Sequence, residues 1–283
     1  PMLADYHVHS EFSDDSVFPV NDVCAVAIER GIDEICFTDH VDFEIRPDWD
    51  EYRADPSCAP IIEGQPSINV DYERHFPTIA EARDRFAGEL TVKTGMEFGV
   101  QSHTIGRFDE LFERFAGEWD FTILSIHQVG NQEFWNGTFQ QGRTQDEYNM
   151  GYYEEMLRVA QRFDHWSVLG HLDLIKRYDQ AGPWPDENAR DIVAEILTHV
   201  IRRGKGIELN TSSIRYGLAD LTPSTELLRL YRDLGGRILT IGSDSHKPEH
   251  LGAHIPMMRE RLKDIGFTEF CTFQGMEPMF HKL

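Results

Sequence analysis

Short runs of apolar residues alternate along this chain with longer segments in which apolar residues recur every three or four positions. Runs of the first kind are typical of buried strands, and the second spacing is typical of helices with one buried face. The short runs predict strands at residues 2–8, 34–38, 90–97, 121–126, 167–169, 206–209 and 237–241. The longer segments predict helices at residues 21–30, 78–87, 104–115, 145–161, 185–203, 223–234 and 256–264. This alternation of strands and helices predicts a parallel sheet, either open or closed into a barrel.

Two polar segments interrupt the alternation. Residues 43–69 contain four prolines, and residues 129–143 are rich in Gly, Asn and Gln. Both follow predicted strands, so both would lie on the rim formed by the carboxyl ends of the strands. Long loops in that place often carry function, although a surface excursion without a role is the alternative. We expect residues 1–283 to form one barrel domain with two rim insertions.

Size, charge and cysteine content narrow the class of protein. A length of 283 residues suits one α/β barrel of roughly 250 residues or two smaller domains. The net charge of −22 repels nucleic acid and anionic membranes, so we expect neither as a partner. The chain shows no secretion signal and no apolar run that could span a bilayer, and its four cysteines form no CxxC pair. These features favour a reducing, cytoplasmic location and leave the oligomeric state open.

Histidines and carboxylates follow six of the seven predicted strands. His7 and His9 are two positions apart in a strand, so both side chains point to one face and could bind one metal ion. The sixth strand is the exception, because it ends at Asn210. In a barrel the carboxyl ends of the strands face one another. We therefore expect nine candidate ligands to meet there: His7, His9, Asp15, His40, Glu97, His127, His171, Asp244 and His246.

Nine nitrogen and oxygen ligands are too many for one ion, because zinc takes four or five and iron or manganese up to about six. The number fits two or three divalent metal ions that share a bridging carboxylate. The absence of thiolate ligands and the excess of imidazole favour Zn, Mn or Fe in a hydrolytic role.

The order of these motifs resembles the PHP (polymerase and histidinol phosphatase) family. Four motifs stand at predicted strand ends: His7-Val8-His9 with the nearby Asp15, Thr38-Asp39-His40, the pair Glu97 and His127, and Asp244-Ser245-His246. The strings at residues 170–178 and 208–215 are similar to the stand-alone histidinol-phosphate phosphatases of that family. The resemblance covers most of the chain. It implies a distorted (β/α)7 barrel with a trinuclear metal centre at the carboxyl ends of the strands.

The resemblance also implies how the ligands divide among three metal ions. The implied sets are His7, His9, Glu97 and Asp244 for the first ion, a bridging Glu97 with His127 and His171 for the second, and Asp15, His40 and His246 for the third. Asp14 is the alternative to Asp15 in the third set.

The activity implied by the resemblance is hydrolysis of a phosphate monoester by a hydroxide that bridges two metal ions. The implied substrate is L-histidinol phosphate, which would give L-histidinol and phosphate in histidine biosynthesis. Asp244, His246 and Asp173 are the candidate catalytic residues. Asp173, like Asp39, would either orient a ligating imidazole or donate a proton.

Two arginines are candidates for binding phosphate, and three aromatic residues are candidates for binding the rest of the substrate. Arg177 and Arg215 follow predicted strands, and the planar guanidinium binds phosphate oxygens in pairs. Alternatively, these two arginines are surface cations that do not bind phosphate. Phe12, Phe18 or Trp135, with rim carboxylates, could contact the ammonium and imidazole groups.

Other functions remain as alternatives. The same scaffold could hydrolyse nucleotides or sugar phosphates, or the chain could bind metal without catalysis. A nuclease or editing module fits the charge of −22 poorly.

Overall fold

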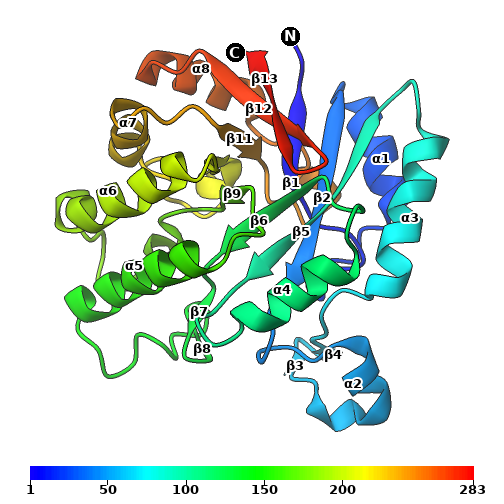
Figure 1. The fold of residues 1–283 in the computed structure, drawn as a ribbon, viewed down its shortest axis with the longest axis horizontal. Helices are drawn as coiled ribbons and strands as arrows, with labels where there is room; N and C mark the ends of the chain where they lie inside the picture. The colour runs from blue at the N-terminus through cyan, green and yellow to red at the C-terminus, as the bar shows by residue number, and fades with distance from the viewer.

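The computed structural model describes residues 1–283 and is built around one parallel sheet of seven strands (Figure 1). Along the sheet the strands follow chain order: β1 (Ala4–Val8), β2 (Glu34–Val41), β5 (Thr91–Gly99), β6 (Phe121–Ser125), β9 (Val168–Leu169), β10 (Gly206–Asn210) and β11 (Leu239–Gly242). The first and last strands then meet, because Val8 forms a parallel bridge with Ser245 and the His9 N–H donates to the Ser245 carbonyl at 2.9 Å. The expected distorted (β/α)7 barrel is confirmed.

Helices surround this barrel (Figure 1). They are α1 (Val20–Glu29), α3 (Tyr72–Arg85), α4 (Ile105–Arg114), α5 (Gln145–Arg162), α6 (Asp186–Arg202), α7 (Thr225–Asp233) and α8 (Ile255–Ile265). Their apolar spacing explains their orientation: in α6, Val193, Ile196 and Val200 are fully buried on one face. None of the helices has the length and apolar character that a bilayer span requires.

The predicted helix at residues 78–87 and the carboxyl-terminal part of the chain differ from the structure. Helix α3 begins at Tyr72 rather than at residue 78, because Pro77 lies inside the helix and does not mark its start. The hairpin of β12 (Glu269–Gln274) and β13 (Glu277–Lys282) was not predicted. Phe273 of this hairpin packs on Phe121, so the hairpin covers the end of the barrel where the strands begin.

Both predicted insertions contain short elements of their own. Residues 43–69 include α2 (Trp49–Ala54), a 3₁₀ turn (Pro56–Cys58) and the hairpin of β3 (Ile61–Ile62) and β4 (Gln65–Pro66). The hairpin of β7 (Gln128–Val129) and β8 (Gln132–Glu133) opens the second insertion. In Figure 1 both hairpins lie at the end of the barrel where β2 and β5 finish. The insertions are therefore placed to build the walls of a site there.

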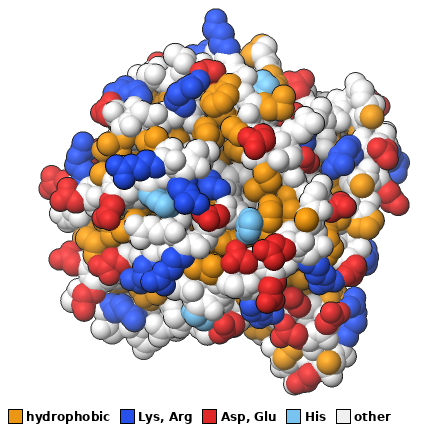
Figure 2. All heavy atoms as spheres, in the orientation of Figure 1, with side chains coloured by type: hydrophobic (Ala, Val, Ile, Leu, Met, Phe, Trp, Pro, Cys, Tyr) orange, Lys and Arg blue, Asp and Glu red, His pale blue; other side chains and the backbone are white.

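Charged side chains are spread over the face of the molecule that Figure 2 shows. On the face drawn in Figure 2, lysines and arginines are interspersed with acidic residues and form no continuous stripe. A basic stripe is the usual electrostatic footprint of a nucleic-acid site, and this face has none.

Candidate metal centre

The candidate ligands come together around Glu97, a buried residue near the end of β5. Its Oε1 lies 3.2 Å from His7 Nε2 and 3.3 Å from His9 Nε2. Its Oε2 lies 3.0 Å from His171 Nε2 and 3.2 Å from His127 Nε2. The two oxygens of one carboxylate therefore face two different groups of imidazoles, and His40 Nδ1 also lies 3.3 Å from Oε1. That is the arrangement expected of a carboxylate that bridges two metal ions.

Asp244 completes the group around His7 and His9. Its Oδ1 lies 3.2 Å from His7 Nε2 and 3.0 Å from His9 Nε2. Asp244 has a φ of +56° and His171 a φ of +23°. Residues other than glycine seldom adopt this region of backbone conformation. Such conformations cost free energy and cluster at functional sites.

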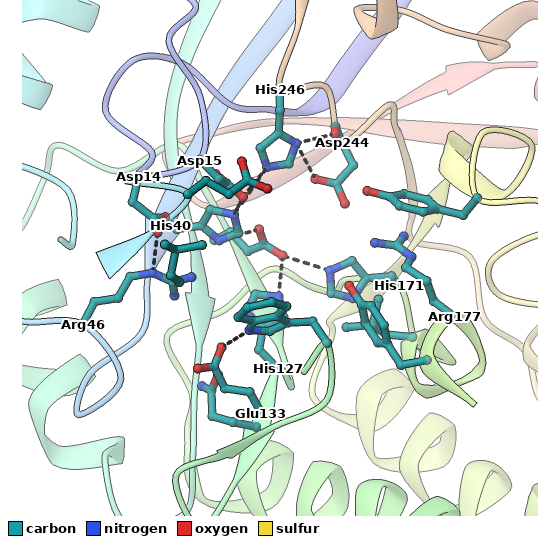
Figure 3. A pocket seen from close by; sticks show the side chains of 18 residues that line it. Asp14, Asp15, His40, Arg46, His127, Glu133, His171, Arg177, Asp244 and His246 are labelled. Atoms are coloured by element: carbon teal, nitrogen blue, oxygen red, sulfur yellow. Dashed lines mark hydrogen bonds and ion pairs between the residues drawn. The ribbon is translucent and has the colours of Figure 1, made fainter. Parts of the chain in front are cut away.

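Asp15, His40 and His246 form a further group at the edge of the centre (Figure 3). Asp15 Oδ2 lies 3.2 Å from His246 Nε2 and 3.5 Å from His40 Nε2. Asp14 is engaged elsewhere, because its carboxylate accepts a hydrogen bond of 2.9 Å from Arg46 Nε. The geometry thus favours Asp15 over Asp14 as the partner of these histidines.

The residues present fit a bound metal. His7 Nε2, His40 Nδ1 and Glu97 Oε1 are buried without a hydrogen-bond partner, and such orphaned atoms are rare in proteins. Three overlapping sets have ligand atoms close enough to share an ion: His7, His9, Glu97 and Asp244; His9, His40 and His246; and His40, Glu97 and His127. The first set matches the predicted one. The overlap of the other two supports more than one ion without assigning each histidine to a single ion.

The electrostatics of the centre favour bound cations. Burial alone would raise the pKa of Glu97, but His7, His127 and His40 hold it well below its usual range. The pKa of Asp244 is likewise low, since His7 and His9 outweigh its burial. Burial disfavours a charged His127, yet Asp42 and Glu97 raise the pKa of its imidazole to about 10. The carboxylates of Glu97 and Asp244 are therefore ionised. Their negative charge can be balanced by protons on the neighbouring histidines or by bound metal ions.

Glu208 supports the centre from β10, the strand that carries none of the predicted ligands. It is fully buried, and its Oε2 lies 2.5 Å from His7 Nδ1. Its Oε1 accepts hydrogen bonds of 3.0 Å from the His171 N–H and from Asn210 Nδ2. Asn210 Nδ2 also lies 3.2 Å from Asp244 Oδ2. One carboxylate therefore orients the imidazole of a candidate ligand, His7, and supports two others, His171 directly and Asp244 through Asn210. The prediction missed it, although a glutamate inside an apolar strand is itself a signal.

Asp42, also missed, orients a second imidazole. Its Oδ1 lies 2.9 Å from His127 Nδ1, and its Oδ2 accepts from Arg46 Nη1 at 2.7 Å. Burial would raise the pKa of Asp42, but His127 and Arg46 lower it to about 2. Asp42 is therefore an ionised acceptor that directs His127 Nε2 toward Glu97.

Asp39 acts on His9 through a serine. Ser13 Oγ donates to Asp39 Oδ1 at 2.7 Å and lies 2.9 Å from His9 Nδ1. The hydroxyl can donate only one hydrogen, so it accepts from His9 Nδ1. This arrangement leaves His9 Nε2 free to face the centre.

Two predicted residues lie outside the cavity. The Asp173 carboxylate accepts from Lys176 Nζ at 2.9 Å and from the Ser224 N–H at 3.0 Å, and it contacts no histidine. Arg215 donates to the carbonyls of Ser243 at 3.0 Å and Asp244 at 2.6 Å. Neither position matches the role that the sequence suggested: Asp173 anchors the turn after β9, and Arg215 braces the backbone at Asp244.

The three aromatic candidates lie in two different places. Phe12 and Phe18 are buried in the core, whereas Trp135 lines the cavity.

A cavity of about 300 Å³ lies over the centre (Figure 3). Arg177 lines it, with its guanidinium 3.7 Å from the centre of the Tyr216 ring and Nη2 donating to Ser212 Oγ at 2.9 Å. The other arginine on the wall, Arg46, is already paired with Asp14 and Asp42. Arg177 is therefore the cation available to an anionic ligand.

Comparisons with known proteins agree with this geometry. A protein named histidinol-phosphatase from Lactococcus lactis subsp. lactis is 31% identical over 96% of this chain and 95% of its own length. A probable histidinol-phosphatase from Thermotoga maritima is 27% identical over 99% of this chain and 100% of its own length. The crystal structure of the L. lactis histidinol phosphate phosphatase, complexed with Zn, L-histidinol and phosphate, superposes with a TM-score of 0.82 at 29% identity and 98% coverage of both chains. The PHP domain profile matches residues 5–212, and the chain therefore belongs to the PHP family.

Proposed function

We propose that this protein hydrolyses phosphate monoesters with two or three divalent metal ions and that L-histidinol phosphate is its substrate. The products are L-histidinol and phosphate, a reaction of histidine biosynthesis. The observation that carries the proposal is the position of Glu97, whose two oxygens face His7 with His9 and His127 with His171. The names of the relatives and the ligands in the L. lactis structure support the substrate.

The resemblance to the PHP family divides the candidate ligands among three ions, and the distances are compatible with that division. We assign one ion to His7, His9, Glu97 and Asp244, a second to Glu97, His127 and His171, and a third to Asp15, His40 and His246. Zinc is supported by the L. lactis structure, and manganese or iron suits the same donors. Divalent ions in such a centre lower the pKa of bound water toward neutrality and offset the charge of the phosphate.

The protein's own groups position the reactants. Arg177 lies over the Tyr216 ring, and we assign its guanidinium to the phosphate oxygens. Glu208 and Asp42 keep their imidazoles turned so that the Nε2 atoms face the cavity. Asp244 and His246 both line the cavity, and their side chains approach to 3.9 Å. Both residues belong to the metal sets above, so we expect their contribution to catalysis to come through the ions that they hold.

A substrate panel tests this proposal. Phosphate release is measured with L-histidinol phosphate, a nucleoside monophosphate, a sugar phosphate and 4-nitrophenyl phosphate, in buffer supplemented with Zn²⁺ or Mn²⁺. We expect kcat/KM for L-histidinol phosphate to exceed that for each other ester by at least about 100-fold. A preference for the nucleotide or the sugar phosphate would show that L-histidinol phosphate is not the substrate. If the metal-loaded protein releases phosphate from none of these esters, it binds metal but is not a phosphatase.

A further inference from the structure

Arg177, the arginine assigned to the phosphate, is carried by a short turn. This is the 3₁₀ turn at Leu174–Tyr178, which follows β9 and the candidate ligand His171. A 3₁₀ turn has poorer hydrogen-bond geometry than an α-helix, so contacts outside the 174–178 turn matter for its position. Arg177 Nη2 donates to Ser212 Oγ at 2.9 Å, and its Nε is buried without a partner. The position of the guanidinium therefore depends on the contacts that fix the turn.

Lys176, the residue before Arg177, anchors the 174–178 turn. Its Nζ lies 2.9 Å from Asp173 Oδ2 and 2.6 Å from Asp186 Oδ1, and Asp186 is in the first turn of α6. Burial alone would lower the pKa of Lys176, but Asp173 and Asp186 raise it, so the side chain is a cation. A single positive charge therefore joins the start of the turn to α6.

Ser224, at the start of α7, joins the same network. Its N–H donates to Asp173 Oδ2 at 3.0 Å, and its hydroxyl donates to Asp186 Oδ2 at 2.7 Å. These donors are neutral, so Lys176 is the cation that pairs with both carboxylates. Without it, a buried and a partly buried anion would face each other, which costs free energy and pushes the two groups apart. Loss of Lys176 should therefore move the turn away from α6.

Lys176 and Arg177 point to different sides of the turn. A 3₁₀ helix has three residues per turn, so neighbouring side chains are separated by about 120°. Lys176 reaches α6, whereas Arg177 lines the cavity and lies over Tyr216 with its guanidinium 3.7 Å from the ring centre. Figure 3 shows Arg177 on the side of the cavity opposite Arg46. Lys176 can therefore set the position of Arg177 without lining the cavity itself.

We propose that Lys176, through its bridge between Asp173 and Asp186, is the positioning residue that holds Arg177 where it binds the phosphate. The inference rests on the proposed function and adds to it a residue outside the cavity that controls the affinity for phosphate. Loss of Lys176 then weakens phosphate binding only while Arg177 is present. A general effect of the lost positive charge would instead persist in Arg177→Ala.

A double-mutant cycle tests this coupling. The dissociation constant of inorganic phosphate is measured by calorimetry on zinc-loaded wild type, Lys176→Met, Arg177→Ala and the double variant, and the zinc content of each is determined. We expect Lys176→Met to raise the dissociation constant by about 5- to 10-fold. In the Arg177→Ala background the same substitution should change it by less than about twofold, because the effects of coupled residues do not add. Lys176→Arg keeps the charge, and its guanidinium can reach both carboxylates, so it should recover most of the affinity.

Two further variants complete the test. Asp186→Asn removes the charge of one partner and leaves the lysine, so it should also raise the dissociation constant, and it serves if Lys176→Met does not fold. Lys263→Met is the matched control, because Lys263 pairs with Glu260 at 3.0 Å on the exposed side of α8. This variant loses the same charge and should bind phosphate as the wild type does.

Three results would overturn the inference and leave the proposed function intact. They are an equal effect of Lys176→Met with and without Arg177, an affinity in Arg177→Ala equal to that of the wild type, and a loss of zinc from Lys176→Met, which would place the bridge in support of His171. The cycle requires no turnover. A wild type that shows the coupling but releases no phosphate from L-histidinol phosphate would support Lys176 as the positioning residue and overturn the proposed function.

Discussion

At the scale of single residues, the centre depends on carboxylates that do not themselves line the cavity. Glu208 and Asp42 each hold the Nδ1 of one ligating histidine, and Asp39 reaches a third through Ser13. Fixing Nδ1 selects the tautomer whose Nε2 is free for a metal ion. The ligands are therefore aligned before any ion binds.

Glu208→Gln tests this alignment. Every contact of the Glu208 carboxylate is with a donor: His7 Nδ1, the His171 N–H and Asn210 Nδ2. Glutamine would turn an NH₂ group against at least one of them. We expect the affinity of metal-free protein for Zn²⁺, measured by competition with a chelator, to fall by about 10- to 100-fold. Glu44→Gln is the control, because Glu44 contacts Asn131 at 3.3 Å and does not line the cavity, and this variant should bind Zn²⁺ as the wild type does. An unchanged affinity in Glu208→Gln would show that Glu208 does not align the candidate ligands.

Arg177→Ala tests the phosphate contact. A hydrogen bond to a charged group contributes about 1.5–3 kcal/mol, so we expect KM for L-histidinol phosphate to rise by about 10- to 100-fold. Metal content should stay at the wild-type level, because Arg177 touches no ligand in the metal sets. Steady-state kinetics and metal analysis of the same preparation give both values. A KM equal to that of the wild type would show that Arg177 does not bind the phosphate.

The clustering of the candidate ligands could be predicted from the sequence because residue type and position at a strand end are local properties. Their supports could not be predicted in this way. Glu208 lies 201 positions from His7 in the chain, and only the closed barrel brings them together. The same reason applies to Arg215, whose place after β10 suggested phosphate binding while its actual partners are carbonyls beyond β11.

At the scale of elements, the close packing of neighbouring strands leaves no space for some side chains. Gly99 is the last residue of β5, and a Cβ atom there would lie 1.7 Å from Asp42 Oδ1 and 2.8 Å from His127 Nδ1. The glycine therefore permits the contact that orients His127.

Gly99→Ala and Gly106→Ala form a matched pair. In the first variant the new methyl group must displace Asp42 or His127, so we expect a lower metal content per chain and a loss of at least about tenfold in kcat/KM. Gly106, in the first turn of α4, has open space at the same point, and alanine there should stabilise the protein by about 0.5–1 kcal/mol. Metal analysis and thermal unfolding of both variants check these outcomes. Wild-type metal content and activity in Gly99→Ala would contradict the packing argument.

Apolar spacing was sufficient to predict all seven barrel strands, including β9, which has only two residues. It was not sufficient for the β12–β13 hairpin, because several residues of β13, such as Met279 and Phe280, are exposed and give no clear buried face. It also could not define the short elements inside the insertions, since two-residue strands have no periodicity to detect.

At the scale of the whole molecule, barrel closure explains how residues as distant as His7 and His246 share one site. The overall charge of −22 opposes the approach of an anionic substrate, and the ionised carboxylates of the centre add to this effect. Bound divalent ions would reverse the local field. Phosphate binding and hydrolysis should therefore both depend on the metal.

Reconstitution of the metal-free protein tests this central claim most directly. The protein is stripped with a chelator, its residual metal content is measured, and phosphate release from L-histidinol phosphate is followed as Zn²⁺ is added in known equivalents. We predict no turnover without metal and a rise that levels off at about two to three equivalents per chain. Undiminished phosphate release by protein shown to be free of metal would contradict the account.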